Sequence, residues 1–179
     1  WRVLAGGFNA TMGFPGEGPV ATLTVATLNP TGMRGKCATL GEAMAQHAPG
    51  RWVLMVQEHH LLPGDAGSEV ASWGHAGCVA LAGPVAPGHG GDRRKASGGV
   101  AVLAGRRWQI GFSRRPVEVP DGWAHRVGLA RVPPEDSPKG REVLVASVYG
   151  WPGGATFPAA TASTDAMLEW VLERLQAGT

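Results

Sequence analysis

The chain has 179 residues, of which 44% are hydrophobic and 17% charged, and its formal net charge is +2. This composition excludes a disordered chain, and so small a net charge does not by itself indicate a nucleic-acid partner, because binding to DNA rests on many phosphate contacts. The 28 glycines and 14 prolines favour short elements joined by tight loops over a helical bundle. No apolar run approaches the length of a membrane span, so no membrane association is predicted.

The two cysteines give the only indication of a cellular compartment. Cys37 and Cys78 lack C-x-x-C spacing and form no zinc pattern. Two free thiols are typical of a reduced protein, so an intracellular location, nuclear or cytoplasmic, is predicted.

The first third of the chain predicts a leader followed by a strand, a helix and a second strand. Residues 1–21 are rich in Gly and Pro and predict an irregular leader, which leaves residues 22–179 as one domain. A β-rich run over 23–28 stops at an Asn-Pro turn signal. Apolar residues recur at helical spacing over 36–48, and the short apolar run 52–56 is typical of a strand buried on both faces.

The middle of the chain predicts loops and one hairpin. Residues 63–96 are expected to be loop-rich, with a short helix near 68–73. Gly98 and Gly99 then introduce a strand over 100–104, for which 108–112 is the predicted hairpin partner.

The last third predicts a second hairpin and a terminal helix. The hairpin pairs 126–132 with 142–149. Apolar residues at helical spacing up to Gln176 predict a helix with Ser163 or Thr164 as its N-cap. The order of elements predicts a mixed α/β (α+β) domain built in layers.

Polar side chains follow three of the predicted buried strands. Asn29 follows the first strand, Glu58 follows the second, and Tyr149 ends the last. If these strands lie side by side in one sheet, their ends meet at one edge, where ligands commonly bind in layered α/β folds. A carboxylate suits a hard cation such as Mg²⁺, and a tyrosine hydroxyl donates well to a phosphoryl oxygen. The alternative is an ordinary exit into solvent, because polar residues follow most strands.

The order of these motifs resembles the endonuclease/exonuclease/phosphatase family, which has the DNase I-like fold. In that family an early strand ends in Asn, a helix begins near a Lys, and the next strand ends in Gln-Glu. A Gly-led strand, a strand ending in Tyr near a Pro, and a helix follow. The matching residues here are Asn29, Lys36, Gln57, Glu58, Gly98, Gly99, Tyr149, Pro152 and the helix up to Gln176.

The resemblance implies a layered α/β sandwich of the DNase I-like type, of which this chain would be the N-terminal part, incomplete on its C-terminal side. It also implies that Glu58 and Asn29 hold Mg²⁺, with Mn²⁺ as an alternative, and that Tyr149 contacts the scissile phosphate. The family's Gly-Asp-x-Asn and Asp-His segments do not occur in these 179 residues, so the chain alone is not expected to turn over substrate. Gly6-Gly7-Phe8-Asn9 resembles the family's Gly-Gly-Asp-Phe-Asn segment without its aspartate.

Four further residues are predicted to contact substrate. His60 would share a face with Glu58 if both lay on an extended strand. Arg126 follows a histidine at the start of a hairpin, Arg94 belongs to one of several basic clusters between 93 and 115, and Trp151 is a candidate for base stacking.

The function implied is metal-assisted hydrolysis of a phosphodiester, with nucleic acid as the favoured substrate. A nuclease acting on DNA is the favoured version. One kind that fits is the endonuclease attached to a retrotransposon reverse transcriptase within a longer polyprotein. Two alternatives stay open: a phosphatase acting on an ester such as a phosphoinositide, and a degenerate domain that binds nucleic acid or a partner without turnover.

Overall fold

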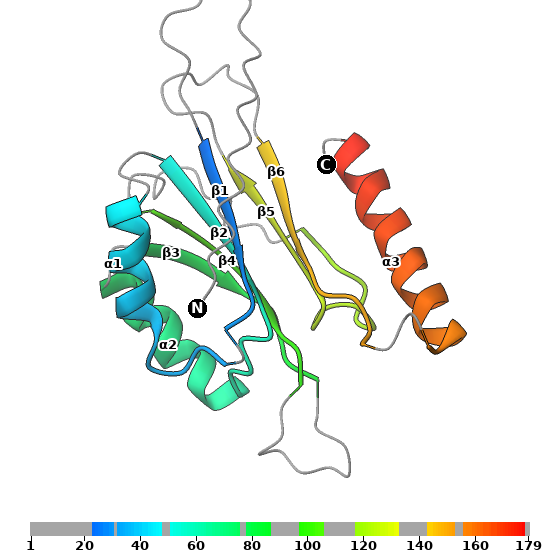
Figure 1. Cartoon of the computed structure of the whole chain (residues 1–179), viewed down its shortest axis with the longest axis horizontal. Helices are drawn as coiled ribbons and strands as arrows, with labels where there is room; N and C mark the ends of the chain where they lie inside the picture. The colour runs from blue at the N-terminus through cyan, green and yellow to red at the C-terminus, as the bar shows by residue number, and fades with distance from the viewer. Residues whose placement is uncertain are drawn as a thin grey trace, which may run out of the picture.

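A computed structural model describes residues 23–30, 32–47, 51–75, 78–86, 97–105, 117–132, 143–152 and 156–177 (Figure 1). The predicted leader, Gly6-Gly7-Phe8-Asn9, Arg94 with the other basic clusters, and the predicted strand 108–112 lie outside the described residues. Within the described part the fold is mixed α/β, as predicted.

The larger sheet has four strands in the order β1-β2-β4-β3. Strand β1 (Leu23–Leu28) runs parallel to β2 (Arg51–Gln57), while β4 (Val100–Gly105) is antiparallel both to β2 and to β3 (Cys78–Ala82). A parallel pair needs a crossover, and helix α1 (Cys37–His47) provides it. The predicted first strand, first helix and second strand are therefore confirmed.

The smaller sheet is the predicted second hairpin. Strand β5 (Val127–Val132) pairs antiparallel with β6 (Val143–Val148), and Figure 1 shows this pair between the larger sheet and helix α3 (Pro158–Ala177). Helices α1 and α2 (Pro63–His75) lie on the opposite side of the larger sheet. The described elements therefore follow one another as helices, sheet, sheet and helix.

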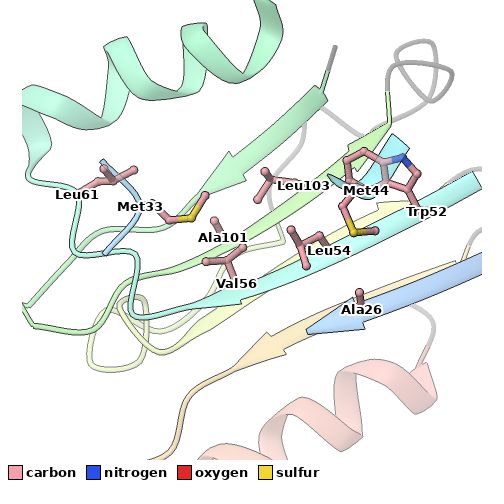
Figure 2. Packing of buried hydrophobic residues seen from close by; sticks show 9 residues of the cluster. All are labelled: Ala26, Met33, Met44, Trp52, Leu54, Val56, Leu61, Ala101 and Leu103. Atoms are coloured by element: carbon pink, nitrogen blue, oxygen red, sulfur yellow. The ribbon is translucent and has the colours of Figure 1, made fainter. Parts of the chain in front are cut away.

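Strand β2 is buried on both faces, as its continuous apolar run predicted. Trp52, Leu54 and Val56 belong to the cluster that reaches Met44 of α1 (Figure 2). The residues between them face the other way, since side chains alternate along a strand. Val53 and Met55 accordingly pack in the cluster shared with the smaller sheet, whose members include Ala130 and Val145.

The loop prediction is wrong over 63–75 and 78–82, although the short helix expected near 68–73 lies within α2. The rest of the predicted loop up to 96 is described only at 83–86. Helix α2 begins at Pro63 and runs for 13 residues, and β3 follows it. Gly64 and Gly67 weaken the helical pattern in the sequence, but proline is well suited to a first helical position, and Asp65 in the first turn favours the helix dipole. Contacts with the larger sheet outweigh the low propensity.

Helix α3 begins earlier than predicted. It starts at Pro158, so neither Ser163 nor Thr164 is its N-cap. Thr164 instead donates from Oγ1 to the Ala160 carbonyl (2.8 Å) and accepts the Trp151 N–H (3.1 Å). Met167 and Val171 face the smaller sheet, whereas Leu168, Leu172 and Leu175 of the same helix are exposed.

None of the helices in the described part of the chain is both long enough and apolar enough to cross a membrane.

Candidate functional site

A sharp turn follows β2 at Gln57. Glu58 and His60 both adopt the left-handed region, with φ of 54° and 53°. Their predicted placement on an extended strand is therefore wrong. The turn is bonded on two sides: the Glu58 carbonyl accepts from Gly32 N–H (2.9 Å), and His60 N–H donates to the Gly98 carbonyl (3.2 Å). Such dihedrals persist only where surrounding contacts over-determine them.

His59 is the side chain that secures this turn. It is fully buried, its Nδ1 accepts the Leu61 N–H (3.0 Å), and its Nε2 lies 3.0 Å from the Gly83 carbonyl. Because Nδ1 accepts, the proton is on Nε2, which donates to Gly83, and the ring is neutral. A Cβ built on Gly99 would lie 2.5 Å from His59 Cε1, so the ring fits only against a glycine. His59 is structural, and the turn it holds presents Glu58.

Tyr149 meets Glu58 across the two sheets. The three strands do not all lie in one sheet, because β6 belongs to the smaller sheet. The ends of β2 and β6 nevertheless converge, and the Tyr149 hydroxyl donates a hydrogen bond to Glu58 Oε1. Val145 faces the larger sheet, and the two-residue period of β6 carries the same direction on to Tyr149.

The environment of Glu58 favours its ionised form. The Tyr149 hydrogen bond is the main reason that the pKa of Glu58 lies below its ordinary value, and a hydrogen bond from Asn29 and the charges of His60 and Arg126 act in the same direction. The same contact raises the pKa of Tyr149, because ionisation of the phenol would remove the donor. The site therefore holds a carboxylate beside a protonated phenol.

Arg126 lies beneath Tyr149. Only 7% of its surface is exposed, and its Nη1 donates to the carbonyl oxygens of Gly150 (2.8 Å) and Tyr149 (3.4 Å). The guanidinium carbon lies 4.5 Å from the centre of the Trp151 ring and 5.3 Å from that of Tyr149. These contacts fix the backbone and rings after β6 and leave little of the guanidinium facing solvent.

The structure brings together most of the predicted site. Glu58, Asn29 and Tyr149 interact directly, His60 and Arg126 act on Glu58 through charge, and Trp151 stacks on Arg126. Arg94 lies outside the described residues. The catalytic and binding roles given to these residues stay predictions.

The oxygen donors at this edge suit a hard cation. Glu58 offers a partly exposed carboxylate and Asn29 an exposed amide. The described residues contain no group of three or more His, Cys, Asp or Glu side chains arranged to hold a metal. Mg²⁺ usually takes only one or two protein carboxylates and completes its shell with water and substrate phosphate, so the two donors fit it.

Two residues beside the site were given no function from the sequence, although Gln57 belongs to its Gln-Glu motif. Gln57 Nε2 donates to Ser147 Oγ (3.2 Å), and Ser147 Oγ donates to the Val56 carbonyl (3.1 Å). Ser147 is fully buried. The alternation of Val145, Ser147 and Tyr149 along one strand was the signal that could have revealed it.

Comparison with known proteins finds a likeness in structure. No family model and no curated protein matches the sequence. The fold is similar to that of the AP endonuclease LMAP from Leishmania major, with a TM-score of 0.61, 21% identity and 84% of this chain covered. The match spans 48% of the endonuclease, so the chain corresponds to about half the length of that protein. The likeness shows that this chain shares its fold with about half of that protein.

Proposed function

We propose that this chain carries the glutamate side of the active site of a Mg²⁺-dependent phosphodiesterase with a layered DNase I-like sandwich, whose substrate is nucleic acid. The observation that carries the proposal is the contact of Glu58 with both Tyr149 and Asn29. Three polar side chains that follow three different strands form one hydrogen-bonded group. Polar residues that follow strands only because the chain turns into solvent would not be expected to bond one another in this way.

Each residue has a definite part in the proposed chemistry. Glu58 and Asn29 would hold the cation, which when bound polarises the phosphodiester and stabilises charge on the leaving oxygen. Tyr149 keeps its proton in this environment, and its hydroxyl would donate to a phosphoryl oxygen when it exchanges Glu58 for the bound phosphate as its acceptor. Arg126 adds positive charge behind the pair and orients the backbone that carries Tyr149.

Nucleic acid is the favoured substrate because the similar fold belongs to an AP endonuclease. The site chemistry recognises a phosphate and not the group attached to it, so activity on a phosphate ester is the outcome that would correct this choice. Attachment to a reverse transcriptase stays a proposal for the longer protein.

The first experiment measures Mg²⁺ binding to the 179-residue chain by calorimetry. Glu58→Gln removes the charge but keeps an oxygen that accepts from Tyr149. We expect the Mg²⁺ affinity to fall by about tenfold or more, since loss of a ligand should exceed the loss of its supporting partners. An unchanged Mg²⁺ affinity in Glu58→Gln would show that Glu58 is not a ligand of the metal.

The matched control is Glu173→Gln, which removes one exposed carboxylate from α3 and should leave the affinity unchanged. A longer protein that contains this chain should cleave DNA in Mg²⁺ and lose the activity with Glu58→Gln. Cleavage of a phosphoinositide but not of DNA would support the proposed site and show that its substrate is a phosphate ester other than nucleic acid.

A further inference from the structure

The contact between Glu58 and Tyr149 crosses from one sheet to the other, so its geometry depends on how the sheets are held at this end. The layer between them is apolar along most of β2 and β6, where Val53 and Met55 pack near Val145. Dispersion and burial hold such a layer together, but they are not directional. An apolar layer alone would not fix the distance between two polar side chains at its edge.

The apolar layer ends in a polar bridge that joins β2 to β6. Gln57 follows Met55 by two residues, and Ser147 follows Val145 by two, so both point into the space between the sheets. Ser147 Oγ donates to the Val56 carbonyl and accepts from Gln57 Nε2, at 3.1 and 3.2 Å. Gln57 Oε1 in turn accepts from Thr27 Oγ1 of β1 (3.1 Å). The bridge therefore ties three strands in two sheets.

The bridge lies directly beside the site in both strands. Glu58 is the residue after Gln57, and Tyr149 lies two residues after Ser147, on the same side of the strand. A buried hydroxyl that loses its partners costs free energy, so the pairing of Ser147 is strongly specified. A shift of one sheet along the other would break this pairing and separate Glu58 from Tyr149 at the same time.

We propose that Gln57 and Ser147 are positioning residues that set the Glu58–Tyr149 contact by fixing the two sheets against each other at this end. Neither side chain touches the Glu58 carboxylate in the described contacts; each acts through the strand that carries its neighbour. The importance of the contact for catalysis rests on the proposed function, whereas the positioning itself does not.

Tyr149 provides a direct readout, because it is the only tyrosine of the chain. Protein labelled with ¹³C on the tyrosine ring therefore gives the ring signals of one residue. In the otherwise unaltered chain, Glu58→Gln should move these signals, because the hydroxyl loses a charged acceptor. With Ser147→Ala in place, we expect most of that response to disappear, since the two groups are no longer held together.

The control separates positioning from general loss of stability. Val145→Ala removes buried volume from the same inter-sheet layer and lowers stability, but it leaves the polar bridge intact. In the Val145→Ala protein, Glu58→Gln should therefore move the Tyr149 ring signals as far as it does in the unaltered chain. If Ser147→Ala does not fold, Gln57→Met tests the same bridge from the partly exposed side, with the same expected loss.

An undiminished response in Ser147→Ala or Gln57→Met would overturn the inference, as would an equal loss in Val145→Ala. All these measurements are made without metal, so their outcome is independent of Mg²⁺ binding. Failure of Mg²⁺ to bind would count against the proposed function alone. If both hold, Ser147→Ala should also weaken Mg²⁺ binding by about tenfold, the usual size of an effect transmitted by a supporting residue.

Discussion

The two halves of the site are held in different ways. On the Glu58 side, backbone hydrogen bonds from the loop after β1 and from the start of β4 enclose the turn, and His59 fills its interior. On the Tyr149 side, the Arg126 side chain bonds the carbonyl oxygens of Tyr149 and Gly150. Backbone hydrogen bonds predominate on the first side. On the second, the Arg126 side chain adds to a main-chain bond from the Tyr149 N–H to the Arg126 carbonyl (2.8 Å), so Arg126 contributes through both its backbone and its side chain.

This difference predicts different sensitivity to substitution. The Glu58 turn should tolerate changes of exposed side chains and fail only where its backbone or the packing of His59 is disturbed. The Tyr149 side should loosen when Arg126 alone is changed. Substitutions on each side can test this contrast, beginning with the one of largest expected effect.

Gly99→Ala should cause the largest loss. The new Cβ would lie 2.5 to 2.8 Å from atoms of the His59 ring, and the residue has a φ of 86°, which disfavours a side chain. Strain and overpacking together should lower the free energy of unfolding by about 3 kcal/mol or more. Denaturant unfolding of the variant and of the unaltered chain measures this loss of stability.

Gly122→Ala is the matched control, because a Cβ added at Gly122 would have no other atom within 4 Å. It should change stability by no more than about 0.5 kcal/mol. Equal losses in the two variants would show that His59 does not hold the turn against Gly99.

Arg126→Leu should have the second-largest effect. It removes two hydrogen bonds from a charged donor to the backbone after β6, and we expect a loss of about 2 kcal/mol. Arg126→Lys should lose nearly as much, because a point charge does not reproduce the planar guanidinium that stacks on Trp151. Both variants should also move the Tyr149 ring signals.

Arg34→Lys is the control on the Glu58 side. The Arg34 side chain is 79% exposed, and its Nη1 lies 3.7 Å from Asp65 Oδ2. Its replacement should therefore lower the free energy of unfolding by no more than about 0.5 kcal/mol and leave the Tyr149 ring signals unchanged. Full stability together with unchanged Tyr149 signals in Arg126→Lys would show that charge alone suffices, and the contrast between the two halves would fail.

The sequence predicted much of the fold because several elements carry strong periodic patterns. The apolar run of β2 and the helical spacing of α1 depend on local residues and burial, and both were correct. Only the part of α2 near 68–73 was predicted and strand β3 was missed, since Gly64 and Gly67 lower helical propensity and only packing against the larger sheet reveals the full helix. Tertiary contacts decided these elements.

The site shows the same division. Strand ends identified Asn29, Glu58 and Tyr149, but no pattern showed that Tyr149 reaches Glu58 from a second sheet. The left-handed turn at Glu58 and His60 was also not predicted, because residues other than glycine adopt that conformation only in a few per cent of cases. It is imposed by the main-chain partners of the turn, which are distant in sequence.

Acidification should give the smallest effect, and it acts on the Glu58 side. Burial lowers the pKa of His59, so the unfolded chain takes up a proton more readily than the folded one. Stability is therefore highest above the ordinary histidine pKa of 6.5 and decreases as the pH falls below it. His125 contributes in the same direction, because burial lowers its pKa too. Denaturant unfolding across this range measures the slope.

The two histidines can be separated by their contacts. His125→Gln removes one titrating group from the partly buried turn before β5 and should leave a reduced slope that comes from His59. Protonated His59 can no longer accept the Leu61 N–H at Nδ1. The backbone amide signal of Leu61 should therefore stay constant as stability begins to fall below pH 6.5, and change only at the lower pH at which the folded protein takes up the proton. A slope that vanishes in His125→Gln, with a Leu61 signal that changes near the ordinary histidine pKa of 6.5, would show that His59 takes up its proton in the folded protein without cost to the fold. The Glu58 turn would then be held by its backbone bonds alone, and the two halves of the site would differ still more.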